Sequence, residues 1–273
     1  MSELYVIKQT KQPNTVESLT QNLKDLGVQA GDTLLVHASM KAIGWISGGP
    51  QAVLEALMNV VTNEGTLVFQ THSPNLSDPA EWENPPVPVE WHQTIRDTMP
   101  GFDAARTPSA FLGVLPELFR NWPMVYRSNH PSVSISAWGK GAEEFVKNHP
   151  LEYSLNEQSP LGRAYERDAH VLLLGVDYST NTSFHLAEYW SKTRKEVTRG
   201  APVLTDGKQQ WITYSDIEFN EDQFPAIGSA FEKKHTVRKA MIGQAESTLF
   251  SMKEAVDFAV DWLVQNKEGE EKM

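Results

Sequence analysis

The sequence has 273 residues, 40% of them hydrophobic and 22% charged, which suits one large α/β domain or two modest ones. It contains no cysteine, and this excludes disulfides, thiolate metal ligands and a cysteine nucleophile. The formal charge is −11, which argues against a nucleic-acid partner and favours a cationic small molecule as ligand. No apolar run reaches the roughly 18 residues of a membrane helix and no signal peptide is recognisable, so we expect a cytoplasmic protein without a membrane partner.

The N-terminal part of the chain predicts a strand, helix, strand unit. A helix is expected over residues 14–27, with Asn14 as its N-cap, Glu17 as the capping-box partner and Gly27 as its end. Buried strands are then expected over 33–39 and 65–71.

Pro50 is well placed to begin the helix that connects these two strands. Such a connection makes the two strands parallel, with their functional loops at the carboxyl ends. Ser39 and Thr71 are therefore predicted to lie at the same edge of the sheet.

Residues 72–106 lose this periodicity and are rich in Pro and Trp. A long irregular segment in a compact domain is typical of either a functional lid or a disordered linker. Trp82, Trp91 and Phe102 favour an ordered lid-like insertion, because disordered linkers contain few aromatic residues.

The remaining segments predict further helices and strands around one sheet. Residues 127–131 are expected to form a polar turn, residues 201–204 and 209–214 a hairpin, and residues 267–273 a frayed tail. The expected strands are 133–138, 170–176 and 245–250, and the expected helices are 116–122, 141–148, 159–167, 222–234 and 251–263. We predict a single α/β domain over residues 1–273, three-layer-like, with a central mainly parallel sheet and an antiparallel portion in the C-terminal third.

The segment after the strand at 170–176 contains the strongest candidate for catalysis. If Asn181 or Thr182 caps a helix there, His185 and Glu188 lie three residues apart on one helical face. The carboxylate can then orient the imidazole, as in a general base. The alternative is a polar helix face that only contacts solvent, which is the common role of polar pairs at this spacing.

Other motifs leave several kinds of chemistry open. The loop from Ser39 to Pro50 offers a hydroxyl, backbone N–H groups and a helix start to a phosphate, but it matches neither a P-loop nor a dinucleotide fingerprint. A metal site at His185 lacks the His-Glu-x-x-His pattern, so we expect no metal. A serine hydrolase would need a Gly-x-Ser-x-Gly elbow, which the sequence around Ser39 does not provide.

Several of these motifs, taken together and in order, resemble the aminoglycoside N3-acetyltransferase family. The resemblance extends over residues 14–263, which is nearly the whole chain. It rests on the segments 36–39, 43–44, 48–49, 127–131, 159–161, 172–175 and 182–188. It implies acetyl transfer from acetyl-CoA to a primary amine, with the 3-amino group of an aminoglycoside as the expected acceptor, on a fold distinct from that of the GNAT acetyltransferases.

The resemblance also implies roles for individual residues. His185 is the expected general base, Glu188 orients it, and the hydroxyl of Thr182 is a candidate donor to the tetrahedral oxyanion. Acetyl-CoA is expected to contact two loops, the end of a strand and one aromatic side chain, namely Ser39, Met40, Lys41, Ala42, Ile43, Gly44, Thr71, Thr107, Leu112, Gly113 and Phe250. The ammonium groups of a polycationic acceptor are expected to meet acidic side chains, for which the candidates are Asp78, Glu81, Glu218 and Glu221.

Two departures from the family pattern leave the acceptor open. Ser179 stands where many members carry Asp, and residues 84–88 form an Asn-Pro-Pro-Val-Pro insertion in the lid. The alternatives are therefore an N-acetyltransferase for another amine metabolite and a binding protein without turnover. A homo-oligomer is compatible with the sequence.

Overall fold

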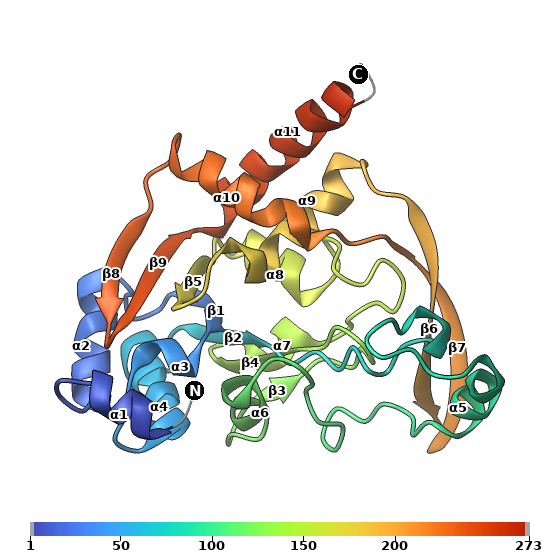
Figure 1. Cartoon of the computed structure of the whole chain (residues 1–273), viewed down its shortest axis with the longest axis horizontal. Coiled ribbons are helices and arrows are strands. Elements are labelled where there is room, and N and C mark those ends of the chain that lie inside the picture. Colours follow the sequence, from blue (N-terminus) through green and yellow to red (C-terminus); the bar gives the residue numbers. More distant parts are fainter. Residues whose placement is uncertain (1–2, 271–273) are drawn as a thin grey trace.

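The computed structural model describes residues 3–270 and places a seven-stranded sheet at the centre of the fold (Figure 1). The strand order is β3-β4-β2-β1-β5-β9-β8. The strands are β1 (Thr33–Ala38), β2 (Thr66–Gln70), β3 (Tyr126–Arg127), β4 (Ile135–Gly139), β5 (His170–Leu174), β8 (Arg238–Ile242) and β9 (Ala245–Ser251). β1 pairs in parallel with both β2 and β5, whereas β4 and β9 add to this centre in antiparallel directions.

Helices cover both faces of the sheet, which confirms the predicted three-layer α/β fold. One face packs against α2 (Val16–Leu26), α4 (Gly49–Val61) and α6 (Val114–Arg120). The other packs against α7 (Ala142–Val146), α8 (Pro160–Glu166), α9 (Ser183–Ser191), α10 (Phe224–Glu232) and α11 (Met252–Glu270). Strand alternation divides the apolar side chains between the two layers, so that Leu34 belongs to the first core and Leu35 to the second.

The cap of α2 differs from the prediction. The N-cap is Thr15, whose hydroxyl accepts a hydrogen bond from the Ser18 amide at 3.1 Å, while the Ser18 hydroxyl accepts one from the Thr15 amide at 2.9 Å. Asn14 instead donates its side-chain amide to the carbonyl oxygens of Ile43 at 3.0 Å and Trp45 at 3.1 Å. The prediction of Asn14 and Glu17 was therefore wrong, because Asn14 holds the loop after β1.

Two strands at the edges of the sheet were not predicted. β8 buries only Ile242, and its exposed Arg and Lys give no apolar alternation. β3 includes Arg127, for which a polar turn was predicted, and pairs with β4 over two residues. Antiparallel strands therefore flank the parallel centre on both sides and not only in the C-terminal third.

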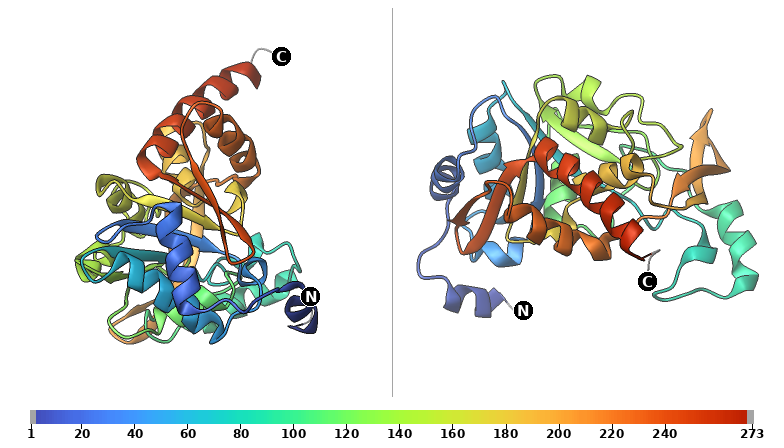
Figure 2. Two further views of the ribbon diagram at one scale, coloured as in Figure 1. Left: turned by 90° about the vertical axis from the view of Figure 1, so that its left-hand side faces the viewer. Right: turned by 90° about the horizontal axis from the view of Figure 1, so that it is seen from above.

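Residues 72–106 contain short helices and pack against a separate hairpin. The helices are η1 (Pro79–Glu81), η2 (Val89–Trp91) and α5 (His92–Thr98), and the hairpin consists of β6 (Glu196–Thr205) and β7 (Lys208–Ile217). The Phe102 amide donates to the Pro202 carbonyl at 3.0 Å, and Gln209 Nε2 donates to the Arg96 carbonyl at 3.0 Å. Both hairpin strands are longer than predicted, and Figure 2 shows hairpin and insertion together at one end of the molecule.

The two ends of the described chain are helical. α1 (Glu3–Gln9) was not predicted, and it buries none of its side chains. α11 continues to Glu270, four residues into the predicted frayed tail, while residues 271–273 lie outside the described part of the chain. No helix within residues 3–270 is long and apolar enough to cross a bilayer.

Candidate active site

The chain leaves β5 at the carboxyl edge of the parallel strands, forms the short helix η3 (Tyr178–Thr180) and then enters α9. Asn181 Oδ1 accepts hydrogen bonds from the Ser183 amide at 3.3 Å and the Ser183 hydroxyl at 2.7 Å, and so stabilises the first turn. Thr182 occupies the N-cap position, but its side chain makes no capping hydrogen bond. The start of the helix therefore fixes the position of His185 in its first turn.

The predicted contact between His185 and Glu188 is present. His185 Nδ1 lies 2.7 Å from Glu188 Oε2, and both side chains are buried. An ionised carboxylate only accepts hydrogen bonds, so Nδ1 is the donor and carries the proton of the neutral ring. Nε2 then presents its lone pair, which is the arrangement a base requires.

Glu188 has two further partners that stabilise a negative charge at a fully buried position. Arg194 Nε donates to Glu188 Oε1 at 2.7 Å, and the Asn220 amide donates to the same oxygen at 2.9 Å. Arg194 also donates through Nη2 to Gln223 Oε1 at 2.7 Å. These contacts connect the carboxylate to η4 (Glu221–Gln223), which lies more than 30 residues further along the chain.

Two aromatic rings pack against the imidazole of His185. The ring centroid of Phe219 lies 4.5 Å and that of Phe224 lies 5.0 Å from the centroid of His185. The planes of these rings lie at 51° and 64° to the imidazole plane. Together with the Glu188 contact at Nδ1, this packing restricts the ring and orients Nε2.

The structure separates the four acidic candidates. Glu221 Oε1 lies 3.5 Å from His185 Nε2, and its side chain is 56% exposed. Asp78 pairs with Arg96 at 2.7 Å, and Glu81 pairs with Arg199 at 2.6 Å. Glu218 forms no ion pair with any described residue.

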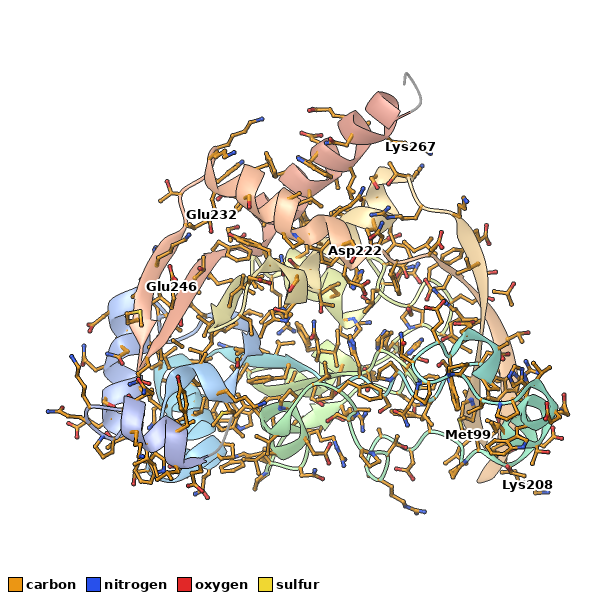
Figure 3. The ribbon with its side chains drawn as sticks, viewed as in Figure 1. Met99, Lys208, Asp222, Glu232, Glu246 and Lys267 are labelled. Carbon is orange, nitrogen blue, oxygen red and sulfur yellow. The ribbon has the colours of Figure 1, made fainter. Side chains whose placement is uncertain are left out.

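Asp78 and Glu81 therefore connect parts of the protein to one another. Asp78 lies within the insertion, and the partner of Glu81 is on β6 of the hairpin. Figure 3 shows Asp222, the neighbour of Glu221, near α10, and it shows Met99 and Lys208 at the far end where α5 meets the hairpin. Of the four candidates, Glu221 alone contacts His185 among the described residues.

Sequence reasoning missed three polar side chains at the same edge of the sheet. His37 on β1, Gln70 on β2 and His72 directly after β2 each have a buried Nε2 atom without a hydrogen-bond partner among the described residues. Burial first, and the nearby His185 second, lower the pKa of both His37 and His72 to about 3, so both rings stay neutral at ordinary pH. The signal in the sequence was a polar residue at or next to the end of each otherwise apolar strand, namely His37 on β1 and Gln70 on β2.

The residues expected to contact acetyl-CoA lie in four places: residues 39–44, Thr71, residues 107–113 and Phe250. Ser39 to Gly44 form the end of β1 and α3 (Met40–Ile43), which packs closely on β5: the Ser39 amide donates to the Leu174 carbonyl at 2.9 Å. A Cβ atom added to Gly175 would lie 2.5 Å from the Ala42 Cβ, so only glycine permits this approach. Ala42 lines a cavity of about 620 Å³, whereas the Ile43 side chain is buried in the core.

The other cofactor candidates differ in their accessibility. Thr71 is buried, and its hydroxyl lies 2.9 Å from that of Ser136 on β4. Leu112 and Gly113 precede α6, and Gly113 has a φ of 83°. Phe250 lies in the hydrophobic core, in contact with Tyr178 and Phe231.

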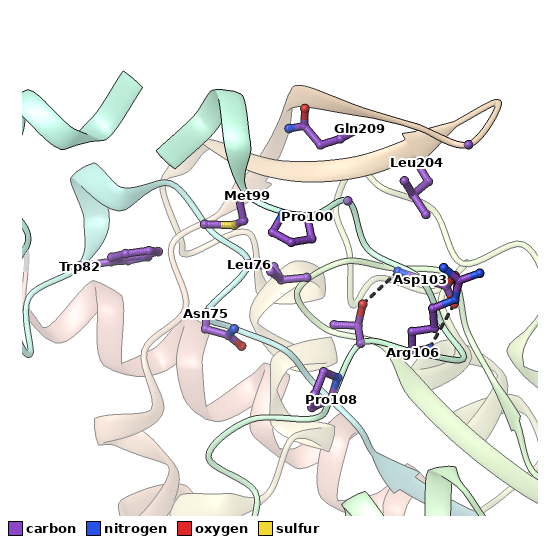
Figure 4. A pocket seen from close by; sticks show the side chains of 13 residues that line it. Asn75, Leu76, Trp82, Met99, Pro100, Asp103, Arg106, Pro108, Leu204 and Gln209 are labelled. Carbon is purple, nitrogen blue, oxygen red and sulfur yellow. Dashed lines mark hydrogen bonds and ion pairs between the residues drawn. The ribbon is translucent and has the colours of Figure 1, made fainter. Parts of the chain in front are cut away.

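A cavity of about 740 Å³ lies between the insertion and the hairpin (Figure 4). Figure 4 shows Trp82, Met99, Pro100 and Leu204 around it. Thr107 also lines this cavity, and its hydroxyl accepts a hydrogen bond from the Asp103 amide at 3.0 Å. The lining residues do not include His185 or Glu188.

No three His, Asp or Glu side chains converge as a metal site within the described part of the chain. Each ring nitrogen of His185 lies near one carboxylate: Nδ1 lies 2.7 Å from Glu188 Oε2, and Nε2 lies 3.5 Å from Glu221 Oε1.

The comparison with protein families gives one match, to the model described as aminoglycoside 3-N-acetyltransferase, over residues 35–264. The chain is 48% identical over 262 residues to the SPbeta prophage-derived aminoglycoside N(3')-acetyltransferase-like protein YokD of Bacillus subtilis, with 96% of both chains covered. It is 33% identical to aminoglycoside N(3)-acetyltransferase III of Pseudomonas aeruginosa, with 92% of this chain and 94% of the relative covered.

Solved structures show the same fold. The crystal structure of YokD from Bacillus subtilis superposes with a TM-score of 0.96 at 47% identity, covering 97% of this chain and 98% of that one. The binary complex of AAC-IIIb with CoASH gives a TM-score of 0.83 at 31% identity, with 93% and 98% covered. AAC-VIa bound to sisomicin gives 0.84 at 27% identity, with 93% and 99% covered.

Proposed function

Because the chain belongs to the aminoglycoside 3-N-acetyltransferase family and is thus an acyltransferase that uses acetyl-CoA, we propose that His185 is the base of an acetyl transfer to a primary amine. The observation that carries this proposal is the Glu188 contact at 2.7 Å, which leaves the lone pair of His185 Nε2 free. The expected acceptor is the 3-amino group of an aminoglycoside.

The reaction requires the transfer of protons in a fixed order. An ammonium group has no lone pair, so it first loses one proton to solvent. As the amine nitrogen bonds to the thioester carbon, His185 Nε2 accepts a second proton and the carbonyl oxygen becomes an oxyanion. The carbon–sulfur bond then breaks, and the imidazolium returns its proton to the departing thiolate. The products are the amide and free CoA, and the net release is one proton.

Glu188 supports this cycle through its position. It orients the ring and balances the charge of the imidazolium, while Arg194 and the Asn220 amide hold the carboxylate in place. A general base of this kind accelerates a reaction by about 10² to 10⁴-fold.

Glu221 is the side chain best placed to receive the ammonium group of the acceptor. With His185 neutral, both Glu221 Oε1 and His185 Nε2 are acceptors, and they lie 3.5 Å apart. An ammonium group between them would donate one hydrogen bond to each. The overall charge of −11 also favours the approach of a polycation. The relative AAC-VIa has been solved with the aminoglycoside sisomicin.

For acetyl-CoA we propose the loop formed by the end of β1 and α3, together with residues 107–113. The complex of AAC-IIIb with CoASH supports CoA binding by this fold. Gly113 is exposed, and no other group lies within 4 Å of the place where a Cβ atom would be, so this part of the region has room for a phosphate or pantetheine group. Gly44, in contrast, is buried against the Gln244 side chain.

The test is incubation with acetyl-CoA and a panel that includes sisomicin, other aminoglycosides and simple primary amines, with release of free thiol and product mass as readouts. We expect one added acetyl group on an aminoglycoside, and tandem mass spectra that place it on the 3-amino group. Turnover only with other amines would contradict the acceptor and retain the mechanism. Binding of CoA and aminoglycoside without turnover would identify a binding protein.

A further inference from the structure

At the carboxyl edge of the central sheet, three polar side chains occupy a face that is otherwise apolar. His37 follows Leu35 on β1 by two residues, and Gln70 follows Val68 on β2 by two residues. Strand alternation therefore puts both on the face that carries the core formed with α9.

His72 extends this group by one more position on the same side. The ladder continues past β2, because the Thr71 amide donates to the Ser134 carbonyl at 2.9 Å and the Ser73 amide donates to the Ser132 carbonyl at 2.9 Å. His72, two residues after Gln70, thus lies on the same face as Gln70. His185 is close enough to both His37 and His72 to affect their charge.

The Nε2 atoms of these side chains are buried, although His72 as a whole is only half-buried. His37 is 5% exposed and Gln70 is 8% exposed. The Nε2 atoms of His37, Gln70 and His72 have no hydrogen-bond partner among the described residues. A buried polar atom without a partner destabilises the free protein, so three such atoms at one edge indicate that a ligand supplies the missing acceptor.

The reaction provides one suitable acceptor beside His185. The amine that gives its proton to His185 Nε2 must simultaneously contact the thioester carbon, so the carbonyl oxygen lies within a few ångströms of the base. Charge develops on that oxygen in the transition state, and buried N–H donors placed in advance stabilise it.

We propose that His37 and His72, with Gln70 beside them, form the donor site for the carbonyl oxygen of the acetyl thioester. This inference rests on the proposed acetyl transfer. Each imidazole carries its proton on Nε2 and donates it to the oxygen, which becomes the oxyanion when the amine attacks. When the carbon–sulfur bond breaks, the oxygen returns to a carbonyl and keeps the same donors.

The neutrality of the two rings fits this role. Burial, with His185 as a smaller contribution, lowers the pKa of both rings, so a neutral N–H rather than an imidazolium faces the oxygen. A neutral imidazole can polarise a carbonyl in this way without adding a charge that would repel the protonated base or the ammonium of the acceptor.

The first experiment measures binding without turnover. The probes are CoASH and the carba analogue of acetyl-CoA, in which a CH₂ group replaces the thioester sulfur, so that the carbonyl remains and the acetyl group cannot be transferred. Calorimetry gives the affinity of each probe for wild type, His37→Leu, His72→Leu and the double variant. The matched control is His149→Leu, which removes another buried histidine.

We expect the double variant to lose about 10-fold in affinity for the carba analogue and less than about twofold in affinity for CoASH. Its kcat should fall by about 10² to 10³-fold. Equal losses for both probes, or a loss confined to the KM of the acceptor, would overturn the assignment. Isotope-edited infrared spectra of bound [1-¹³C]acetyl-CoA without acceptor provide a second readout. The carbonyl stretch should shift to lower frequency in wild type and return toward its solution value in the double variant.

These measurements separate this inference from the proposed function. A wild-type protein that polarises the carbonyl but acetylates no amine would contradict the proposed function alone. A wild type with normal turnover, together with a double variant that retains full kcat and an unchanged carbonyl stretch, would contradict this inference alone.

Discussion

Two groups of histidines differ in whether their ring nitrogens have hydrogen-bond partners. His130 accepts hydrogen bonds at Nδ1 from the amides of Ser132 and Val133, and its Nε2 lies 3.2 Å from the Leu151 carbonyl. His149 lies 4.8 Å from His130 between ring centroids, and both its nitrogens are also partnered. We call these two the closed histidines.

His37 and His72 each have a buried Nε2 without a hydrogen-bond partner among the described residues. His185 is hydrogen-bonded at Nδ1, while its Nε2 lies 3.5 Å from Glu221 Oε1. We call these three the open histidines. A closed ring contributes to stability, because every polar atom is satisfied inside the protein. An open ring costs stability in the free protein and can gain a partner from a ligand. The difference therefore separates structural histidines from those available to the reaction.

The largest effect is expected from the open histidine with the carboxylate partner. His185→Ala should lower kcat by about 10² to 10⁴-fold at saturating acetyl-CoA, because the base is lost. Steady-state thiol release measures this. Affinity for CoASH should stay within about twofold of wild type. A variant with wild-type kcat would show that His185 is not the base.

A closed histidine should show the opposite pattern. His149→Leu leaves the Ser128 hydroxyl and the Ser154 carbonyl without their partner, and we expect a loss of about 2 to 4 kcal/mol in the free energy of unfolding. Urea unfolding measures this loss. At a temperature where the variant is folded, its kcat should remain within about threefold of wild type. A stable variant with a large loss of kcat would remove the distinction between the two groups.

The closed histidines also predict a dependence of stability on pH. Burial lowers the pKa of His130 to about 4 and that of His149 well below its ordinary value. Below about pH 6.5 the unfolded chain binds protons at these positions and the native protein does not, so stability falls as the pH falls toward 4. At pH 5 each ring contributes a loss of up to about 2 kcal/mol.

Unfolding in urea at pH 7 and pH 5 measures this loss. His130→Asn retains an acceptor in place of Nδ1 but has no ring to protonate, so its stability should depend less on pH over this range. An unchanged slope in this variant would contradict the assignment of the effect to His130.

A smaller effect is expected at Glu221. Glu221→Gln should raise the KM of a polycationic acceptor by about 2 to 5-fold with little change in kcat, because an exposed ion pair contributes about 1 kcal/mol or less. Added salt should reduce the difference between variant and wild type. Glu218→Gln serves as the control on the neighbouring segment. If both variants behave alike, the Glu221 carboxylate has no specific role.

Local patterns predicted much of this molecule. The alternation of apolar strands and capped helices predicted the α/β fold, and the spacing of His185 and Glu188 predicted their contact because it depends only on the geometry of one helix. Edge strand β8 was missed because its side chains are mostly exposed. Asn14 was misread because its partners, the carbonyls of Ile43 and Trp45, are distant in the sequence.

Contacts between distant segments account for what the sequence did not predict in the site. Arg194 and the Asn220 amide meet Glu188 only because the chain returns to α9 after the hairpin. The helix predicted between β1 and β2 implied that these strands are parallel. Their register puts His37 beside Gln70. We expected Ser39 and Thr71 at that edge. Thr71 lies on the opposite face from its neighbours Gln70 and His72, and the unpartnered nitrogens belong to those two residues and to His37.

The most direct test of the distinction between open and closed histidines is an NMR titration of protein labelled with ¹⁵N-histidine, with each ring assigned by single substitution. Addition of the carba analogue of acetyl-CoA should shift the imidazole nitrogen signals of His37 and His72, and that of His185 to a smaller extent. The signals of His130 and His149 should not move. Shifts at His130 and His149 without shifts at His37 and His72 would contradict the account.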